Sequence, residues 1–229
     1  MKTFQYILIL IAGAVAAFVA LRPEIDRSAQ APVEGLPWQI EVLADGHSRV
    51  FGLELPQSLL ADARERFGDG MKIGIVAAQG EAGALEAYYD SVTAGIILGK
   101  MILVAQIDPH TLNGMRERSV DRTHMNDSTF RYLLAREDLS RALLAPITAI
   151  TFIPAADLDV ETVEKRFGPP QERLRAAEHA LHFLYPDRGL HLLIDDKGKE
   201  LLQYVAPRDF ARLRDPLLED AATVPVEAR

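Results

Sequence analysis

The sequence predicts an α+β protein of two tandem repeats, each a short helix packed on a small antiparallel sheet, after an N-terminal transmembrane helix. Three observations predict this architecture. Residues 4–21 carry no charged side chain, and short strand and helix patterns alternate from Trp38 onward. The tripeptide Arg-Phe-Gly occurs at 66–68 and again at 166–168, one hundred residues later. This spacing suggests that one unit was duplicated.

The N-terminal segment 1–21 is predicted to be a membrane anchor or a signal segment. Its apolar part, 4–21, reads FQYILILIAGAVAAFVAL and would span roughly 27 Å as a helix, close to the ~30 Å hydrocarbon core of a bilayer. A retained anchor is favoured. A cleaved signal peptide stays open, because Ala14-Val15-Ala16 resembles a cleavage site. A buried core helix is least favoured, because the segment has no polar face.

The same segment bears on which side of the membrane the soluble body is expected to lie. Lys and Arg residues flank it on both sides, so their count gives no strong orientation. Its resemblance to an export signal favours a single-pass protein of the inner membrane with a periplasmic body. Residues 22–37 hold three prolines and small polar side chains, which is typical of a linker.

Residues 38–107 form the first predicted repeat. We expect strands at 38–43, 49–55, 71–78 and 100–107, and either a strand or a helix at 85–90. A helix is expected through LLADARERF to Phe67, with Ser58 as its N-cap, because a hydroxyl oxygen can accept a hydrogen bond from a free amide of the first turn. Gly68 should end this helix with a positive φ.

Residues 147–212 form the second predicted repeat. Strands are expected at 147–153, in the second half of 177–186, at 189–195 and at 199–205. The helix VETVEKRF should begin after Asp159 and end at Gly168, and Pro169-Pro170 prevents its continuation. The last three strands should form an antiparallel meander with a turn at 196–198.

The remaining segments have no duplicated counterpart. Residues 108–146 are predicted to be a helical connector, with a polar loop and short helix over 108–128 and an amphipathic helix over 128–145. Residues 213–229 are predicted to be a flexible tail.

Composition excludes several classes of function. The chain has 229 residues and a formal net charge of −8, so nothing favours nucleic-acid binding. It has no cysteine, which rules out disulfides, thiolate metal sites, cysteine nucleophiles and lipid attachment through an N-terminal cysteine. No glycine-rich phosphate loop or Gly-x-Ser-x-Gly elbow is present. No cofactor is expected.

The histidines are the strongest candidates for site chemistry. His179, His182 and His191 with Asp187 could cluster around one hairpin and hold a metal, although surface positions on strand edges explain them better. His47 and Asp45 share a turn, and His110 and His124 lie in the polar insert. We assign no catalytic, cofactor-binding or metal-binding residue. Six aromatic residues are expected in the core rather than on a binding face: Trp38, Phe51, Tyr88, Tyr89, Phe183 and Tyr204.

Three short segments carry a family resemblance. Arg166-Phe167-Gly168-Pro169, Tyr185 to Leu190, and Asp196-Lys197-Gly198-Lys199 resemble the small outer-membrane-protein A/BamE-like superfamily of bacterial envelope domains, a structural neighbourhood that includes the β-lactamase inhibitory protein with its tandem helix-plus-sheet repeats. The resemblance implies export and action by binding other proteins. This chain lacks the lipobox cysteine of the BamE-like lipoproteins, so their role and their binding residues are not transferred.

These observations favour a membrane-anchored domain of the bacterial cell envelope that binds protein or peptide without catalysis. Its expected partners are another envelope or membrane protein and, through residues 4–21, the membrane itself. Two alternatives stay open. One is an envelope hydrolase with a site of histidine and carboxylate groups in a groove between the repeats, and the other is a structural subunit of a membrane complex.

Overall fold

The computed structural model of the protein describes residues 33–125, 128–176, 179–219 and 223–225. All of them belong to one compact unit, Val33–Arg229. The predicted anchor at 4–21 and residues 22–32 of the predicted linker lie outside the described residues. Within the described ranges, no helix combines the length and the apolar character that a membrane crossing requires.

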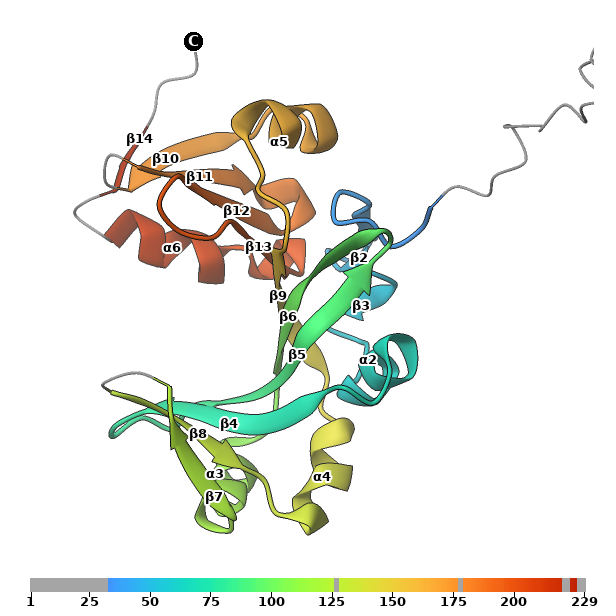
Figure 1. Ribbon diagram of the computed structural model, residues 1–229, viewed down its shortest axis with the longest axis vertical. Coiled ribbons are helices and arrows are strands. Elements are labelled where there is room, and N and C mark those ends of the chain that lie inside the picture. Colours follow the sequence, from blue (N-terminus) through green and yellow to red (C-terminus); the bar gives the residue numbers. More distant parts are fainter. Residues whose placement is uncertain (1–32, 126–127, 177–178, 220–222, 226–229) are drawn as a thin grey trace, which may run out of the picture. The chain divides into compact units, whose positions relative to one another are not determined.

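The fold is α+β, and its main element is a fully antiparallel sheet of eleven strands (Figure 1). The strands lie in the order β14-β10-β11-β12-β13-β9-β6-β5-β4-β8-β7. Their bounds are β4 Lys72–Ala78, β5 Ala84–Ala94, β6 Ile97–Ala105, β7 Asp121–His124, β8 Thr129–Leu133, β9 Ile147–Pro154, β10 Glu172–Ala176, β11 Ala180–Tyr185, β12 Leu190–Asp195, β13 Leu201–Val205 and β14 Thr223–Pro225. A smaller sheet holds β1 Glu41–Val42, β2 Ser48–Val50 and β3 Leu53–Leu55.

Helices cover both faces of the large sheet. The described residues form α2 Leu60–Phe67, α3 Pro109–Glu117, α4 Arg136–Leu143, α5 Val160–Phe167, α6 Ala211–Glu219 and the 3-10 turns η2 Pro186–Arg188 and η3 Pro207–Asp209. The buried side chains of α2, α3, α4 and α5 share one large core. Leu213 and Leu217 of α6 pack in a second, smaller core with Leu184 and Phe210. Figure 1 shows α5 and α6 on opposite sides of β10–β13.

Strand β9 joins the two halves of the large sheet. Phe152 on β9 is in register with Met101 of β6 on one side and with Leu202 of β13 on the other. All three side chains are buried. The sequence predicts two small sheets, and pairing along both edges of β9 merges their strands into one sheet. The merged sheet leaves neither edge of β9 unpaired, and unpaired edges are prone to aggregation.

The ends of α5 confirm the prediction for that helix. A side-chain oxygen of Asp159 accepts a hydrogen bond from the Thr162 amide at 2.6 Å, and Gly168 follows the last turn with φ of 80°. The prediction that Ser58 caps α2 is wrong. Leu59 is the capping residue, and the Asp62 carboxylate accepts from its amide at 2.7 Å. The Ser58 hydroxyl instead accepts from the Glu54 amide, within the preceding turn.

Residues 49–55 form a hairpin rather than the single strand that was predicted. Phe51 and Gly52 connect β2 to β3 with φ of 55° and 76°. Two consecutive positive values are typical of the tight turns that suit the twist of a hairpin. A positive φ costs roughly 1–2 kcal/mol for a residue with a side chain. Burial of the Phe51 ring offsets this cost, because it contacts the rings of Phe152 and Tyr204 at centroid distances of 5.4 and 5.2 Å.

The connector is less helical than predicted. Helix α4 begins only at Arg136, and Thr129–Leu133 is strand β8, which pairs with β4 and with β7. The segment Thr-Phe-Arg-Tyr-Leu is rich in β-branched and aromatic residues, so it is well suited to a strand. The apolar spacing that suggested a long helix is explained by a strand and a shorter helix in succession.

The C-terminal region and one strand also differ from the predictions. Residues 213–219, placed in a flexible tail, lie in α6, and β14 pairs with β10. Strand β10 was not predicted, because the alternating run Glu-Arg-Leu-Arg-Ala holds only one large apolar residue. The predicted strand over 38–43 contains only the two-residue β1. Four of the six aromatic residues, Phe51, Tyr89, Phe183 and Tyr204, are buried as expected, whereas Trp38 and Tyr88 are partly exposed.

Candidate functional site

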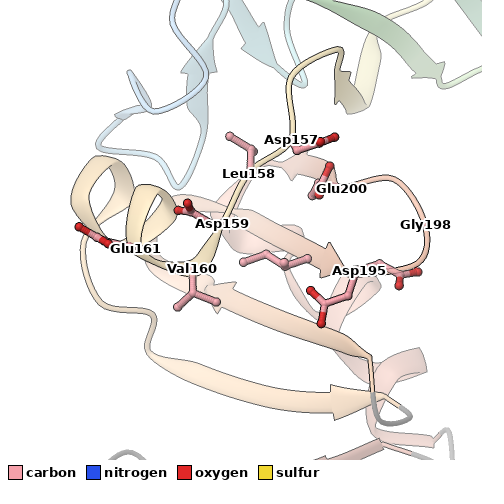
Figure 2. A pocket seen from close by; sticks show the side chains of 10 residues that line it. Asp157, Leu158, Asp159, Val160, Glu161, Asp195, Gly198 and Glu200 are labelled. Carbon is pink, nitrogen blue, oxygen red and sulfur yellow. The ribbon is translucent and has the colours of Figure 1, made fainter.

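A cavity of about 680 Å³ lies beside the N-terminal end of α5 (Figure 2). The loop from β9 to α5, the first turn of α5, the end of β12 and the turn from β12 to β13 surround it. Its position follows from the local sequence. Pro154 ends β9 and Asp159 begins α5, so the residues between them form an open loop above the sheet. The β12–β13 turn extends beside that loop.

The lining of this acidic cavity is dominated by carboxylates. Six lining residues are acidic, and none of the described ones is lysine, arginine or histidine. The acidic residues are Asp157, Asp159, Glu161, Asp195, Asp196 and Glu200. Like charges in one cavity raise its negative potential, since the low-dielectric walls focus the field. The cavity therefore favours a cationic ligand over a neutral or anionic one.

Three of these carboxylates already have partners within the chain. Asp159 caps α5, and hydrogen bonding from Thr162 lowers the pKa of its carboxyl. Asp195 accepts a hydrogen bond from the Lys197 amide at 3.0 Å, which closes the β12–β13 turn. Asp157 lies 3.5 Å from the ammonium nitrogen of Lys199, and both side chains are largely exposed. Such an exposed pair is weak.

Glu200 differs from the other acidic residues of the cavity. Only 7% of its surface is exposed, and its Oε2 has no hydrogen-bond partner within the described part of the chain. Burying a carboxylate without a partner is costly, because the charge loses its water shell. Figure 2 shows the Glu200 side chain directed toward the same space as Asp157, whereas the Glu161 side chain lies on the other side of the first turn of α5.

A second cavity, small and apolar, adjoins the acidic one. It has a volume of about 100 Å³ and is enclosed by Pro37, Trp38, Phe152, Val163, Phe167 and Leu202, among others. Leu158 lines both cavities. The Trp38 ring meets Phe167 edge-on at 6.2 Å, and the Arg166 guanidinium lies 4.7 Å from its centre. The acidic and the apolar cavity thus share one lining residue, Leu158.

The structure brings together His182 and His191, but not on the surface as expected. Both are more than 90% buried, and their rings are stacked at 5.0 Å. His182 Nδ1 lies 2.8 Å from His191 Nε2, and His191 Nδ1 lies 2.8 Å from Gln203 Oε1. Because Gln203 Oε1 can only accept, His191 carries its proton on Nδ1, and its Nε2 accepts from His182. Strand pairing places both rings on the face of the sheet that α6 and its small core cover, and this position explains their burial.

The pKa of His191 is lowered to about 4, mainly by burial; the Gln203 contact opposes this shift and the nearby His182 adds to it. The other members of the predicted cluster lie elsewhere. His179 Nε2 lies 3.7 Å from Asp195 Oδ1, and the Asp187 carboxylate accepts a hydrogen bond from the side-chain amide of Gln171. Among the described residues, no three histidine, aspartate or glutamate side chains have an arrangement that could hold a metal ion.

The other histidines lie in separate regions. His47 is buried, with Nδ1 3.0 Å from Asp45 Oδ2, although the angle does not make a hydrogen bond. The His124 and Phe130 rings lie 4.3 Å apart and are tilted by 53°, and His110 is exposed in α3. The hydrolase hypothesis expects histidine, aspartate and serine in one groove. The described linings of the acidic and apolar cavities contain neither histidine nor serine.

Sequence reasoning missed the acidic cavity and Glu200. A usable signal was present, because the alternation in Glu-Leu-Leu-Gln-Tyr places Glu200 on the same face as Leu202 and Tyr204, which are buried. Comparison of the chain with protein-family models, curated proteins and solved structures gave no match.

Proposed function

We propose that this protein is a membrane-anchored domain of the bacterial cell envelope that binds a protein or peptide at the two cavities beside α5, without catalysis. One observation carries the proposal: an acidic cavity lined by the buried Glu200, whose Oε2 has no hydrogen-bond partner in the described part of the chain, shares Leu158 with an apolar cavity. A binding site needs apolar space and a few oriented polar groups, and both are present here.

The proposal includes two tandem repeats, and the surroundings of the two Phe-Gly pairs support them. The amides of Gly68 and Gly168 donate to the carbonyls of Arg64 and Glu164, four residues earlier in each helix, at 2.8 and 2.9 Å. Both glycines have nearly the same backbone angles, φ 88° and ψ 180° against φ 80° and ψ 179°.

The strands that follow each helix add further support. In the first half, α2 is followed by the consecutive antiparallel strands β4, β5 and β6, and in the second half α5 is followed by β10, β11 and β12. The second strand of each series carries a tyrosine that bonds the carbonyl of the helix-ending glycine. A single helix on three strands has a small core, so merging two copies through β9 stabilises both.

The membrane location rests on the sequence of residues 4–21. A reporter that is active only outside the cytoplasm, fused after residue 229, tests it. We expect activity from the fusion on intact cells, and the same fusion lacking residues 1–21 is the control. Activity of a cytoplasm-specific reporter at the same position would contradict the periplasmic location of the body.

In-cell cross-linking tests the binding site. A photo-reactive amino acid at position 158 lies between the two cavities, and one at position 144 on the exposed end of α4 is the matched control. We expect a discrete cross-linked product with an envelope protein or peptide from position 158 and none from position 144. Equal cross-linking from both positions, or none from either, would count against a binding site beside α5.

A further inference from the structure

We infer that the acidic cavity receives the basic side chain, lysine or arginine, of a bound peptide, with the Glu200 carboxylate as its counter-charge. The inference rests on the proposed function and names the ligand chemistry of the same site. It begins with Glu200, whose Oε2 is buried and has no partner in the described part of the chain.

A cationic hydrogen-bond donor would offset the free-energy cost of burying the Glu200 Oε2 without a partner. An ammonium or guanidinium supplies both the opposite charge and the hydrogen bond, and charge-assisted hydrogen bonds of this type are short and strong. A neutral donor would satisfy the hydrogen bond only. Glu200 and Asp157 both line the cavity (Figure 2), so a cation placed there is attracted by both carboxylates.

The size and spacing of the acidic groups favour an organic cation over a metal ion. The cavity holds about 680 Å³, which is far larger than a bare ion needs. Asp157 and Glu200 lie on one side of it and Asp195 on the other (Figure 2). Within the described residues, no set of three acidic or histidine side chains converges closely enough for metal coordination. A lysine or arginine side chain has the length and the several donors to use separated carboxylates.

The neighbouring apolar cavity distinguishes a peptide from a small polyamine. Leu158 borders both cavities, so an apolar side chain next to the basic one can contact Leu158 and the Trp38–Phe167 pair. A polyamine has only short methylene segments between charged amines, so it can fill the apolar space only by desolvating those charges, whereas an uncharged apolar side chain fills it without that cost. We therefore assign the cavity to a basic residue adjacent to an apolar residue in a peptide or an exposed protein loop.

The test uses the full-length chain in a nonionic detergent. Binding is measured by calorimetry with three probes: the capped pentapeptide Ala-Leu-Arg-Leu-Ala, its analogue with glutamate in place of arginine, and spermidine. We expect binding of the arginine peptide, weakened by added salt because the attraction is between charges, and no binding of the glutamate peptide. Binding of spermidine as strong as that of the arginine peptide would overturn the assignment to a peptide.

Three variants locate the interaction. Glu200→Gln keeps the shape of the side chain and removes its charge, so affinity for the arginine peptide should fall at least tenfold. Asp157→Asn, at a side chain that is 86% exposed, should weaken binding by a smaller factor without affecting folding. Glu65→Gln, on the exposed surface of α2, is the control and should bind normally. Unchanged binding in both cavity variants would overturn the inference.

The melting temperature without peptide gives a second readout. Because Glu200→Gln replaces a buried carboxylate, one oxygen of which has no hydrogen-bond partner in the described part of the chain, we expect this variant to melt at the same or a higher temperature than the wild type. If it fails to fold, Glu200 is a structural residue, the inference is overturned for Glu200, and Asp157→Asn decides the role of the cavity. If the peptide does not bind but cross-linking at position 158 succeeds, the inference fails while the proposed function stands.

Discussion

The hydroxyl of Tyr185 donates a hydrogen bond to the carbonyl oxygen of Gly168 at 2.9 Å. This contact fixes the end of α5 against the second strand that follows it. The first half of the chain has the same contact, since the Tyr89 hydroxyl lies 3.2 Å from the Gly68 carbonyl and also contacts that of Ala63 at 3.1 Å. The phenylalanine before each glycine packs on the same tyrosine, with ring centroids 6.2 and 5.9 Å apart.

Removing either hydroxyl should destabilise the protein by a similar amount. We expect Tyr89→Phe and Tyr185→Phe each to lower the free energy of unfolding by about 1 kcal/mol, because a carbonyl at the end of a helix loses its donor. Urea unfolding followed by circular dichroism measures this change. Tyr132→Phe, at a half-buried residue of β8, is the control. A loss in only one of the two variants would argue against equivalent contacts.

The same two tyrosines should ionise late. Desolvation raises the pKa of Tyr89 and of Tyr185 to about 12, from the ordinary value of 10.0. The native state therefore keeps protons that the unfolded chain releases, so stability present below pH 10 should be lost as the pH rises toward 12. In an ultraviolet titration, tyrosinate absorbance from these two residues should appear only near the pH at which the protein unfolds. In Tyr185→Phe the late component should shrink, and an unchanged titration would contradict the assignment.

The two helix-ending glycines should tolerate substitution equally poorly. A Cβ at Gly68 or Gly168 would meet no atom within 4 Å. Their backbone angles, however, belong to a region that is essentially restricted to glycine. We expect Gly68→Ala and Gly168→Ala each to lower the free energy of unfolding by about 1–3 kcal/mol. Gly70→Ala is the control, because Gly70 has no left-handed φ and its Cβ would make only an ordinary contact with Tyr89 Cδ1 at 4.0 Å. An effect no larger than that of this control would show that the backbone relaxes.

Stability should fall in mild acid because of His191. Its pKa is about 4 in the folded protein, against 6.5 for an ordinary histidine. Between these pH values the histidine is protonated in the unfolded chain and neutral in the folded chain. The free energy of unfolding that is present above pH 6.5 therefore falls by roughly 3 kcal/mol as the pH decreases to 4.

Urea unfolding across this pH range measures the effect. His191→Gln should flatten the pH dependence, and His110→Gln, at an exposed histidine, should leave it unchanged. His182 stacks on His191 and is the other titratable group of this contact. A steep dependence that persists in His191→Gln would assign the effect to His182 or to carboxylates elsewhere.

The sequence predicted those elements whose signals are local. Helix α5 was predicted to the residue, because the Asp159 side chain caps its first turn and Gly168 ends it with a positive φ, and both signals are local. Strands β4, β6, β9, β12 and β13 follow from the alternation of apolar side chains. Strand β10 was not predicted, because a charged strand is stabilised by its neighbours β11 and β14 rather than by its own composition.

The candidate site could not be predicted in the same way. Asp157 and Glu200 are far apart in the chain, and they border one cavity only because β13 pairs with β9. The burial of His182 and His191 likewise depends on α6 and its core, in a region that the sequence predicted to be partly flexible. Long-range strand pairing decided both features, and no local pattern reports it.

By itself, the sequence determined the α+β class, most helix and strand positions and the absence of cysteine chemistry, because periodicity, capping and composition act over a few residues. Only the tertiary structure decided that the strands merge into one sheet through β9, that the Glu200 Oε2 has no hydrogen-bond partner in the described part of the chain, and that an apolar cavity adjoins the acidic one. These features arise from contacts between distant segments, whose free energy depends on which faces and edges meet when the chain folds.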